Sequence, residues 1–270
     1  IKGSGSNHSI SNSSSTTSTS RSKFYGTAIQ TDGGSQHFVV ADSSDFEFGS
    51  GEFTIEFWIN AESVDGDGMA SWLMKGTNDS NNAFDWRIYA SGDGSNENLY
   101  ANIRTSDGTK NLGPNTNNAP DDEWVHIALA RDNTNNKLYF YKNGVKVDEA
   151  SIASGATIND DYSDGLTWGY FNAITGSNHY GFNGWVNDIR IYKGHCKYSG
   201  GTTFNVITEG SPEELDVFVD SPSNNAPSSG SDGDGGATNG NYCTWNPLAV
   251  QTSGHGGFRR SNLEIIADTA

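Results

Sequence analysis

The stretch that decides the fold is residues 51–60, which read GEFTIEFWIN. Its apolar residues recur at every second position, which is the period of a β-strand. In an extended chain they share one face, made of Phe53, Ile55, Phe57 and Ile59. The opposite face carries Thr54, Glu56, Trp58 and Asn60. This alternation predicts a strand that turns one face toward a hydrophobic core.

The same alternation recurs on both sides of this stretch. In EWVHIALAR, residues 123–131, one face carries Val125, Ile127 and Leu129. In KLYFYKNGVKV, residues 137–147, Asn143-Gly144 supplies the two positive φ angles of a tight hairpin. Further candidate strands are KFYGTAIQT, QHFVVA, SWLMKG, FDWRIYA, LYANIRT, GLTWGYF and GWVNDIRIYKG. Ten or more short strands and no convincing helix predict an all-β fold of two packed antiparallel sheets.

Two polar segments divide the chain into a body and its flanks. Residues 1–22 contain ten Ser and three Thr, and residues 208–241 are rich in Gly, Ser and Asp. Residues 1–22 have almost no apolar side chains and residues 221–241 have no Leu, Ile, Val or aromatic residue, so neither stretch can offset the entropy of its own ordering by burial. We therefore expect residues 1–22 as an arm and residues 208–241 as a linker, both outside the sandwich. The body is expected over residues 23–207, and residues 242–270 as the truncated start of a further β-segment.

The overall composition excludes several classes of protein. The formal net charge of −17 repels phosphate backbones and anionic lipids, so a nucleic-acid partner is not expected. Apolar runs of five residues or so are far shorter than the roughly 20 that a membrane-spanning helix needs, so membrane insertion is not expected either. Cys196 and Cys243 have no metal-like spacing, which leaves two free thiols or one disulfide open. The chain starts at Ile1, and we expect a processed product or a piece of a longer chain.

Three sequence blocks carry a resemblance to a known family. They are residues 23–60 (KFYGTAIQTDGGSQHFVVADSSDFEFGSGEFTIEFWIN), 121–150 (DDEWVHIALARDNTNNKLYFYKNGVKVDEA) and 181–194 (GFNGWVNDIRIYKG). In this order they resemble the laminin-G-like or concanavalin A-like lectin/glucanase domains, of the kind found in marine bacteriophage tail-fibre and adhesin proteins. The resemblance implies a concanavalin A-like two-sheet antiparallel jelly-roll sandwich.

An enzymatic role is not expected. Glucanases of this fold resemble one another in an E-x-D-x-x-E run on the catalytic strand, and this chain has no such run. The nearest pair, Glu52 and Glu56, would lie roughly 13 Å apart along one strand, against about 5 to 5.5 Å in a retaining glycosidase. We interpret these two residues as solvated carboxylates on a sheet, and the mid-strand His126 as a hydrogen-bonded structural residue.

The resemblance also implies a structural calcium ion on the convex face. In lectin and glucanase relatives this ion takes an aspartate from the last strand and backbone carbonyls from earlier turns. Asp188 in GWVNDIRIY matches that aspartate, and Asp32 in the TDGG turn is its expected neighbour. The alternative is that both carboxylates cap turn N–H groups. Oxygen-rich loops at 65–68, 160–165 and 232–234 lack the full EF-hand pattern.

Sugar binding requires flat apolar rings with hydrogen-bonding groups beside them. The residues that fit this description are Trp72, Asn78, Asp79, Asp85, Trp86, Arg87, Trp168, Tyr170, His179 and Tyr180. The alternative for each aromatic ring is a place in the sandwich core or on a sheet face. Trp58, Trp124 and Trp185 are assigned to structure.

Two functions compete at this point. The first is a non-enzymatic carbohydrate-recognition or adhesion module of a virion appendage, which binds host cell-surface glycans at the virion surface or outside the cell. The second is a purely structural fibre or decoration domain, and a secreted bacterial lectin or glycosidase ranks below both. Expected partners are copies of the chain, in a homo-oligomer that is threefold by resemblance, or other virion proteins.

Overall fold

The computed structural model describes residues 8–24, 26–63, 69–78, 83–91, 98–118, 122–169, 181–206 and 242–245. It is built from strands, and the helical turns within these ranges are two short 3-10 turns, η1 (Ser44–Phe46) and η2 (Ser199–Gly201). The predicted linker, residues 208–241, and most of the predicted last segment lie outside the described residues. No helix in the described part is long and apolar enough to cross a membrane.

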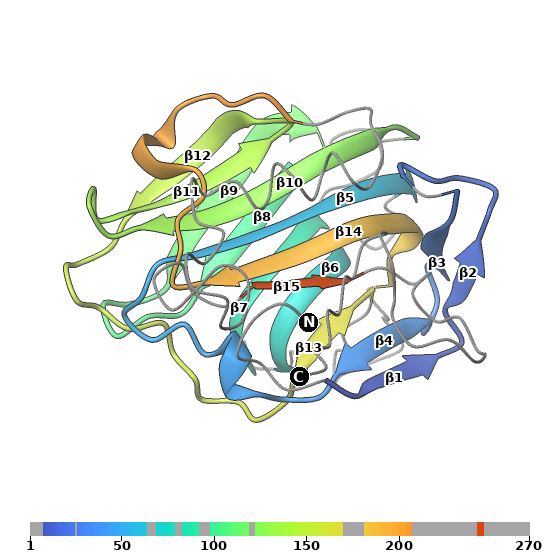
Figure 1. Ribbon diagram of the computed structural model, residues 1–270, viewed down its shortest axis with the longest axis horizontal. Helices are drawn as coiled ribbons and strands as arrows, with labels where there is room; N and C mark the ends of the chain where they lie inside the picture. Colours follow the sequence, from blue (N-terminus) through green and yellow to red (C-terminus); the bar gives the residue numbers. More distant parts are fainter. Residues whose placement is uncertain are drawn as a thin grey trace, which may run out of the picture.

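The strands form two antiparallel sheets that lie on one another as layers (Figure 1). The first has the order β1-β4-β13-β6-β7-β8-β9. Its strands are β1 (Ile10–Ser13), β4 (His37–Val40), β13 (Leu166–Trp168), β6 (Met69–Asn78), β7 (Ala83–Ser91), β8 (Asn98–Ile103) and β9 (Lys110–Asn118).

The second sheet has the order β12-β11-β10-β5-β14-β3-β2, and β15 also pairs with β14. Its strands are β12 (Val145–Ser151), β11 (Lys137–Lys142), β10 (Trp124–Asp132), β5 (Phe53–Ser63), β14 (Asn183–Lys193), β3 (Ala28–Asp32), β2 (Thr16–Ser18) and β15 (Tyr242–Trp245). Two such sheets face to face are the predicted concanavalin A-like jelly-roll sandwich.

The alternation in the sequence decides which side chains fill the space between the sheets. Phe53, Ile55, Phe57 and Ile59 are all fully buried there, as predicted. Val125, Ile127 and Leu129 on the neighbouring strand β10 lie beside them on the same face of the sheet and fill the same core. The Asn143-Gly144 hairpin is confirmed as well, because both residues have positive φ, 50° and 76°.

The N-terminal arm corrects the sequence prediction, because it belongs to the sandwich. β1 pairs with β4 from Ile10↔Val40 to Ser13↔His37, and β2 pairs with β3 from Thr16↔Gln30 to Ser18↔Ala28. The chain crosses from one sheet to the other at Ser14, which has φ 63°. Arm side chains in both strands remain mostly exposed. Main-chain hydrogen bonds to two open sheet edges therefore hold the arm, and these bonds do not depend on apolar side chains.

Deletion of residues 1–18 is expected to lower the melting temperature by a few degrees and to make the protein self-associate. The main-chain hydrogen bonds that are lost contribute about 1 kcal/mol each, and the conformational entropy of the arm offsets much of this. The edges of β3 and β4 that become exposed are templates for strand pairing between molecules. Light scattering over a concentration series would measure the association. Ile10→Ser in the full-length chain is the control, since it keeps the main-chain bonds. A truncated chain that melts and scatters like the full chain would refute this account.

The outer face of the second sheet is covered as well. After β14 the chain leaves the sheet and passes over the strands β10 to β12 (Figure 1, orange); we name residues 194–206 the strap. Phe204 donates its N–H to the Gly144 carbonyl, and the Tyr141 hydroxyl donates to the Tyr198 carbonyl. Glu56 on β5 is therefore buried, which corrects its interpretation as a solvated carboxylate.

Candidate functional site

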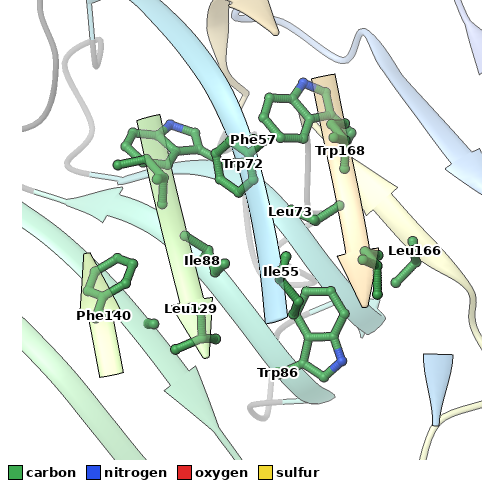
Figure 2. Packing of buried hydrophobic residues seen from close by; sticks show 14 of the residues in the cluster. Ile55, Phe57, Trp72, Leu73, Trp86, Ile88, Leu129, Phe140, Leu166 and Trp168 are labelled. Atoms are coloured by element: carbon green, nitrogen blue, oxygen red, sulfur yellow. The ribbon is translucent and has the colours of Figure 1, made fainter. Parts of the chain in front are cut away.

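The three tryptophans predicted to stack on sugar lie in the core. Trp72, Trp86 and Trp168 are 0%, 1% and 0% exposed, and Figure 2 shows them among aliphatic side chains between the sheets. Trp168 packs edge-on against Phe57 at a centroid distance of 5.2 Å. A ring packed on all sides has no face left for a ligand, so these three residues are structural. Burying the apolar surface of these large rings against other rings is more favourable than exposing it to water.

Asp85 is also removed from the predicted sugar site. Its carboxylate is fully buried and lies 3.2 Å from the Nζ atom of Lys75, while its other oxygen accepts the N–H of Asp161. The contacts of Asp85 are therefore internal.

Arg87 is placed differently, on the outer face of the seven-stranded sheet. On β7 it alternates with Trp86 and Ile88, which point into the core. Its Nε donates to the side-chain oxygen of Asn102 at 2.9 Å, and the Asn102 amide donates to the side-chain oxygen of Asn111 at 2.9 Å. The three residues lie side by side on β7, β8 and β9, because Arg87 pairs with Asn102 and Asn102 with Asn111.

Two tyrosines extend this row of polar groups. Tyr89 and Tyr100 are cross-strand partners, and their rings stack with centroids 5.0 Å apart and planes 12° from parallel. The guanidinium of Arg87 lies 4.6 Å from the centroid of the Tyr89 ring. Tyr89 is buried and Tyr100 half-buried, and burial raises the pKa of the Tyr89 phenol against the opposing effect of Arg87.

We name Arg87, Tyr89, Tyr100, Asn102 and Asn111 the outer-face patch. It combines the half-buried ring of Tyr100 with two side-chain amides, which contain both donors and acceptors. Asn111, at the edge of the patch, is exposed to solvent. Sequence reasoning found Arg87 but missed the other four. The available signal was the alternation in LYANIR, residues 99–104, which puts Tyr100 and Asn102 opposite the core positions Leu99 and Ala101.

The other predicted sugar-site residues cannot be assigned to this patch. Asn78 ends β6, where its backbone pairs with Ala83, and its side chain is outside the described part of the structure. Asp79, Tyr170, His179 and Tyr180 also lie outside the described residues.

A family model agrees with this architecture. The model for the "Concanavalin A-like lectin/glucanases superfamily" matches residues 32–197, which is more than half of the chain. The chain belongs to this family. The match spans η1 and the strands from β4 to β14, and so includes the whole outer-face patch.

Several solved structures resemble this concanavalin A-like domain. Domain 4 of AbnA, an extracellular arabinanase from Geobacillus stearothermophilus solved with arabinotriose, is 17% identical with a TM-score of 0.46, over 69% of this chain and 82% of that one. The CBM40 of the Ruminococcus gnavus IT-sialidase, bound to α2,3-sialyllactose, is 15% identical with a TM-score of 0.47, over 64% and 91%. The binding domain of botulinum neurotoxin serotype G is 14% identical with a TM-score of 0.48, over 75% and 45%. Comparison with curated proteins finds no match.

The residues predicted to hold calcium in this concanavalin A-like domain do not fit a shared ion. Asp188 is 5% exposed, and its Oδ1 accepts from the Nε of Arg190 at 2.9 Å. Asp32 instead caps its own turn, since its two oxygens accept from the Gly34 N–H and the Gln36 side chain. Asp32 pairs with Asn183, five residues from Asp188 along β14, so the two aspartates are separated by roughly 15 Å.

Arg190 places a positive charge beside Asp188. Burial alone would lower the pKa of the Arg190 guanidinium, but the carboxylates of Asp188 and Glu56 outweigh it and hold that pKa well above its usual range. The guanidinium therefore balances the charge of the Asp188 carboxylate, and calcium binding at Asp188 stays a prediction. Among the described residues, no group of three or more metal-ligating side chains comes together.

Glu56 occupies a second buried charge cluster, under the strap. Its Oε1 accepts from the Nζ of Lys197 at 2.7 Å, its Oε2 accepts the hydroxyl of Tyr198, and the Nε2 of His126 lies 3.6 Å from Oε2. Burial alone would raise the pKa of Glu56, but Lys197, His126 and Arg190 hold it well below its usual range. Glu52 accepts instead from the backbone N–H groups of Asn133 and Cys196. These internal partners give the two carboxylates structural roles.

Proposed function

We propose that the chain is a carbohydrate-recognition module that binds a glycan on the outer-face patch. The observation that carries this proposal is the half-buried ring of Tyr100, stacked on Tyr89 and bordered by the Arg87–Asn102–Asn111 hydrogen-bond row. A pyranose ring has an apolar face that packs on an aromatic ring and hydroxyls that need both donors and acceptors. The exposed side-chain amide of Asn111, at the end of this row, provides both kinds of group.

The patch is also rigid before any ligand arrives. Each of its side chains is held by a neighbour on an adjacent strand, so binding would require little ordering of side chains. A sheet face positions groups more accurately than a loop does. Membership of a family that includes lectins supports the same class of ligand.

The biological setting that we propose is adhesion. The resemblance of residues 23–60, 121–150 and 181–194 to tail-fibre and adhesin domains supports a virion appendage that attaches to cell-surface glycans. The acidic composition is compatible with an exposed domain of this kind. Copies of the chain or other virion proteins are the proposed neighbours, and the location is the virion surface or the outside of the cell.

Tyr100→Ala is expected to weaken glycan binding by about tenfold, because ring stacking contributes at most about 1.5 kcal/mol. A glycan-array screen of the full chain would first identify a ligand, and calorimetry would then compare the variant with the parent. Tyr162→Ala is the matched control, since Tyr162 is a half-buried tyrosine in the 159–165 loop, outside the patch. Equal affinities for parent and Tyr100→Ala would reject the patch as the binding site.

A structural role is the second candidate, and one observation favours it. The three tryptophans of the predicted sugar site, Trp72, Trp86 and Trp168, contribute to the core and not to the surface. A fibre or decoration domain needs such a core and no ligand. The absence of binding to any glycan on the array at millimolar sugar would favour this structural function over glycan recognition.

A further inference from the structure

A lysine is buried among carboxylates beside the strand pair β6 and β7. Lys75 on β6 is 1% exposed, and four oxygen atoms surround its Nζ. They belong to the side chains of Asp160 at 2.6 Å, Asp85 at 3.2 Å and Asp42 at 3.6 Å, and to the Tyr162 carbonyl at 3.0 Å. Neither the outer-face patch nor the proposed function uses this cluster.

The charges in this cluster do not balance. Three carboxylates share one ammonium, while the neighbouring Arg104 is paired with a fourth carboxylate, that of Asp161, at 3.2 Å. Carboxylates that share a site cannot all ionise easily. Burial raises the pKa of Asp85, and the nearby Asp160 raises it further, against the opposing effects of Lys75 and the Asp161 N–H. The direction of this shift favours the neutral form of the Asp85 carboxyl.

The surroundings of Asp85 are those of an acyl group held for attack by an amine. Its Oδ2 faces the Lys75 amine, and its Oδ1 accepts the backbone N–H of Asp161 at 2.9 Å. That N–H is placed to stabilise negative charge on Oδ1, as a donor in an oxyanion hole does. Asp160 touches the amine at 2.6 Å and is partly exposed, so it can accept a proton from the amine and return it to solvent.

We propose that Lys75 and Asp85 join in an intramolecular isopeptide bond. Asp160 takes a proton from the Lys75 ammonium, and the free amine attacks Cγ of the protonated Asp85 carboxyl to give a tetrahedral intermediate. The nitrogen then passes its second proton to Oδ2, the Cγ–Oδ2 bond breaks, and Oδ2 leaves as water, while Asp160 returns its proton to solvent. Overall one ammonium and one carboxylic acid become one amide, one water and one proton released to solvent, with no oxidant or co-reactant.

The bond would act on the strands that carry the outer-face patch. β6 and β7 are neighbours in the first sheet, and Asp85 is two residues from Arg87 on β7. An amide between the strands would remove the buried ammonium and one carboxylate, both of which are expensive to desolvate. It would also fix the end of β7 covalently, whether or not the patch binds a glycan.

Trypsin and mass spectrometry test the proposal on the full chain. Trypsin cuts after Lys and Arg, so an unmodified chain releases residues 24–75 and 76–87 as separate peptides. The isopeptide removes the positive charge that trypsin needs at Lys75. We expect a single peptide, residues 24–87, whose mass is lower than its sequence mass by one water, about 18 Da. Fragmentation should place the loss at Lys75 and Asp85 together.

Two variants and one side reaction complete the test. Lys75→Arg keeps a positive charge but has no amine nucleophile, so its 24–87 region should keep the full mass, whereas Asp160→Asn should slow bond formation and leave a mixture. Succinimide formation at an Asp-Gly pair also removes one water, but it leaves Lys75 cleavable. Peptides 24–75 and 76–87 recovered quantitatively from the parent chain would overturn the proposal and leave an ordinary ion pair.

Discussion

Asp188→Ala is expected to lower the free energy of unfolding by about 3–5 kcal/mol, because it leaves the buried Arg190 guanidinium without its closest carboxylate. Both side chains are 5% exposed, so water cannot replace the lost partner. Urea denaturation followed by tryptophan fluorescence would measure the change. Asp164→Ala, at an exposed aspartate in the 159–165 loop, is the matched control and should unfold like the parent.

The same experiment decides between an ion pair and a calcium site at Asp188. If Asp188 forms only an ion pair, Asp188→Ala should lose the same stability in EDTA as in millimolar calcium, because no metal takes part. A calcium site predicts that the parent chain loses stability in EDTA while Asp188→Ala does not. Parent and variant that converge in EDTA would refute the Arg190 assignment.

The alternation of side chains made the core predictable where one period continued without interruption. β5 and β10 keep their period over the paired segments, so Phe57 and Ile127 could be placed inside from sequence alone. The hairpin at Asn143-Gly144 was equally local, since both residues favour the positive φ that the turn requires. The family match from residue 32 to residue 197 covers these elements.

In the first sheet, irregular strand pairing interrupts the alternation of buried and exposed side chains. The β6–β7 register shifts between Ser71 and Leu73, so the consecutive residues Trp72 and Leu73 are both buried. Period-two reasoning would put only one of them inside. That shift is one reason why Trp72 could be mistaken for a surface ring.

Cross-strand partners were the second kind of missing information. The outer-face patch consists of side chains from β7, β8 and β9, and only the register shows that Tyr89 meets Tyr100. The arm illustrates the same limit. Its polar composition correctly excluded a buried segment, but the free edges of β3 and β4 that bind it are formed by residues elsewhere in the chain.

Segments that cover a sheet were the third kind of information that the sequence alone does not show. Glu56 alternates with core residues on β5, which normally indicates a solvated position. It is buried because Lys197 and Tyr198 of the strap, more than a hundred residues later in the chain, cover it. A long-range contact of this kind leaves no local pattern in the sequence.

Glu56→Gln is expected to lower the free energy of unfolding at neutral pH by about 3 kcal/mol, because an amide cannot balance the charges of Lys197 and Arg190 in this buried cluster. The folded-state pKa of Glu56 is well below the value of about 4.3 of an unfolded chain. Its contribution is therefore fully present above about pH 4.3 and is lost as the pH falls through the lower, folded-state pKa.

The variant should accordingly lose part of the acid sensitivity of the parent, as well as stability. Urea unfolding between pH 7 and pH 3 would show a gap between the two proteins that is constant at neutral pH and narrows in acid. Glu62→Gln, at an exposed position of the same strand, should follow the parent at every pH. A gap that stayed unchanged down to pH 3 would mean that the Glu56 carboxylate does not hold the strap by its charge, and that packing of Tyr198 and Phe204 against Tyr141 does so instead.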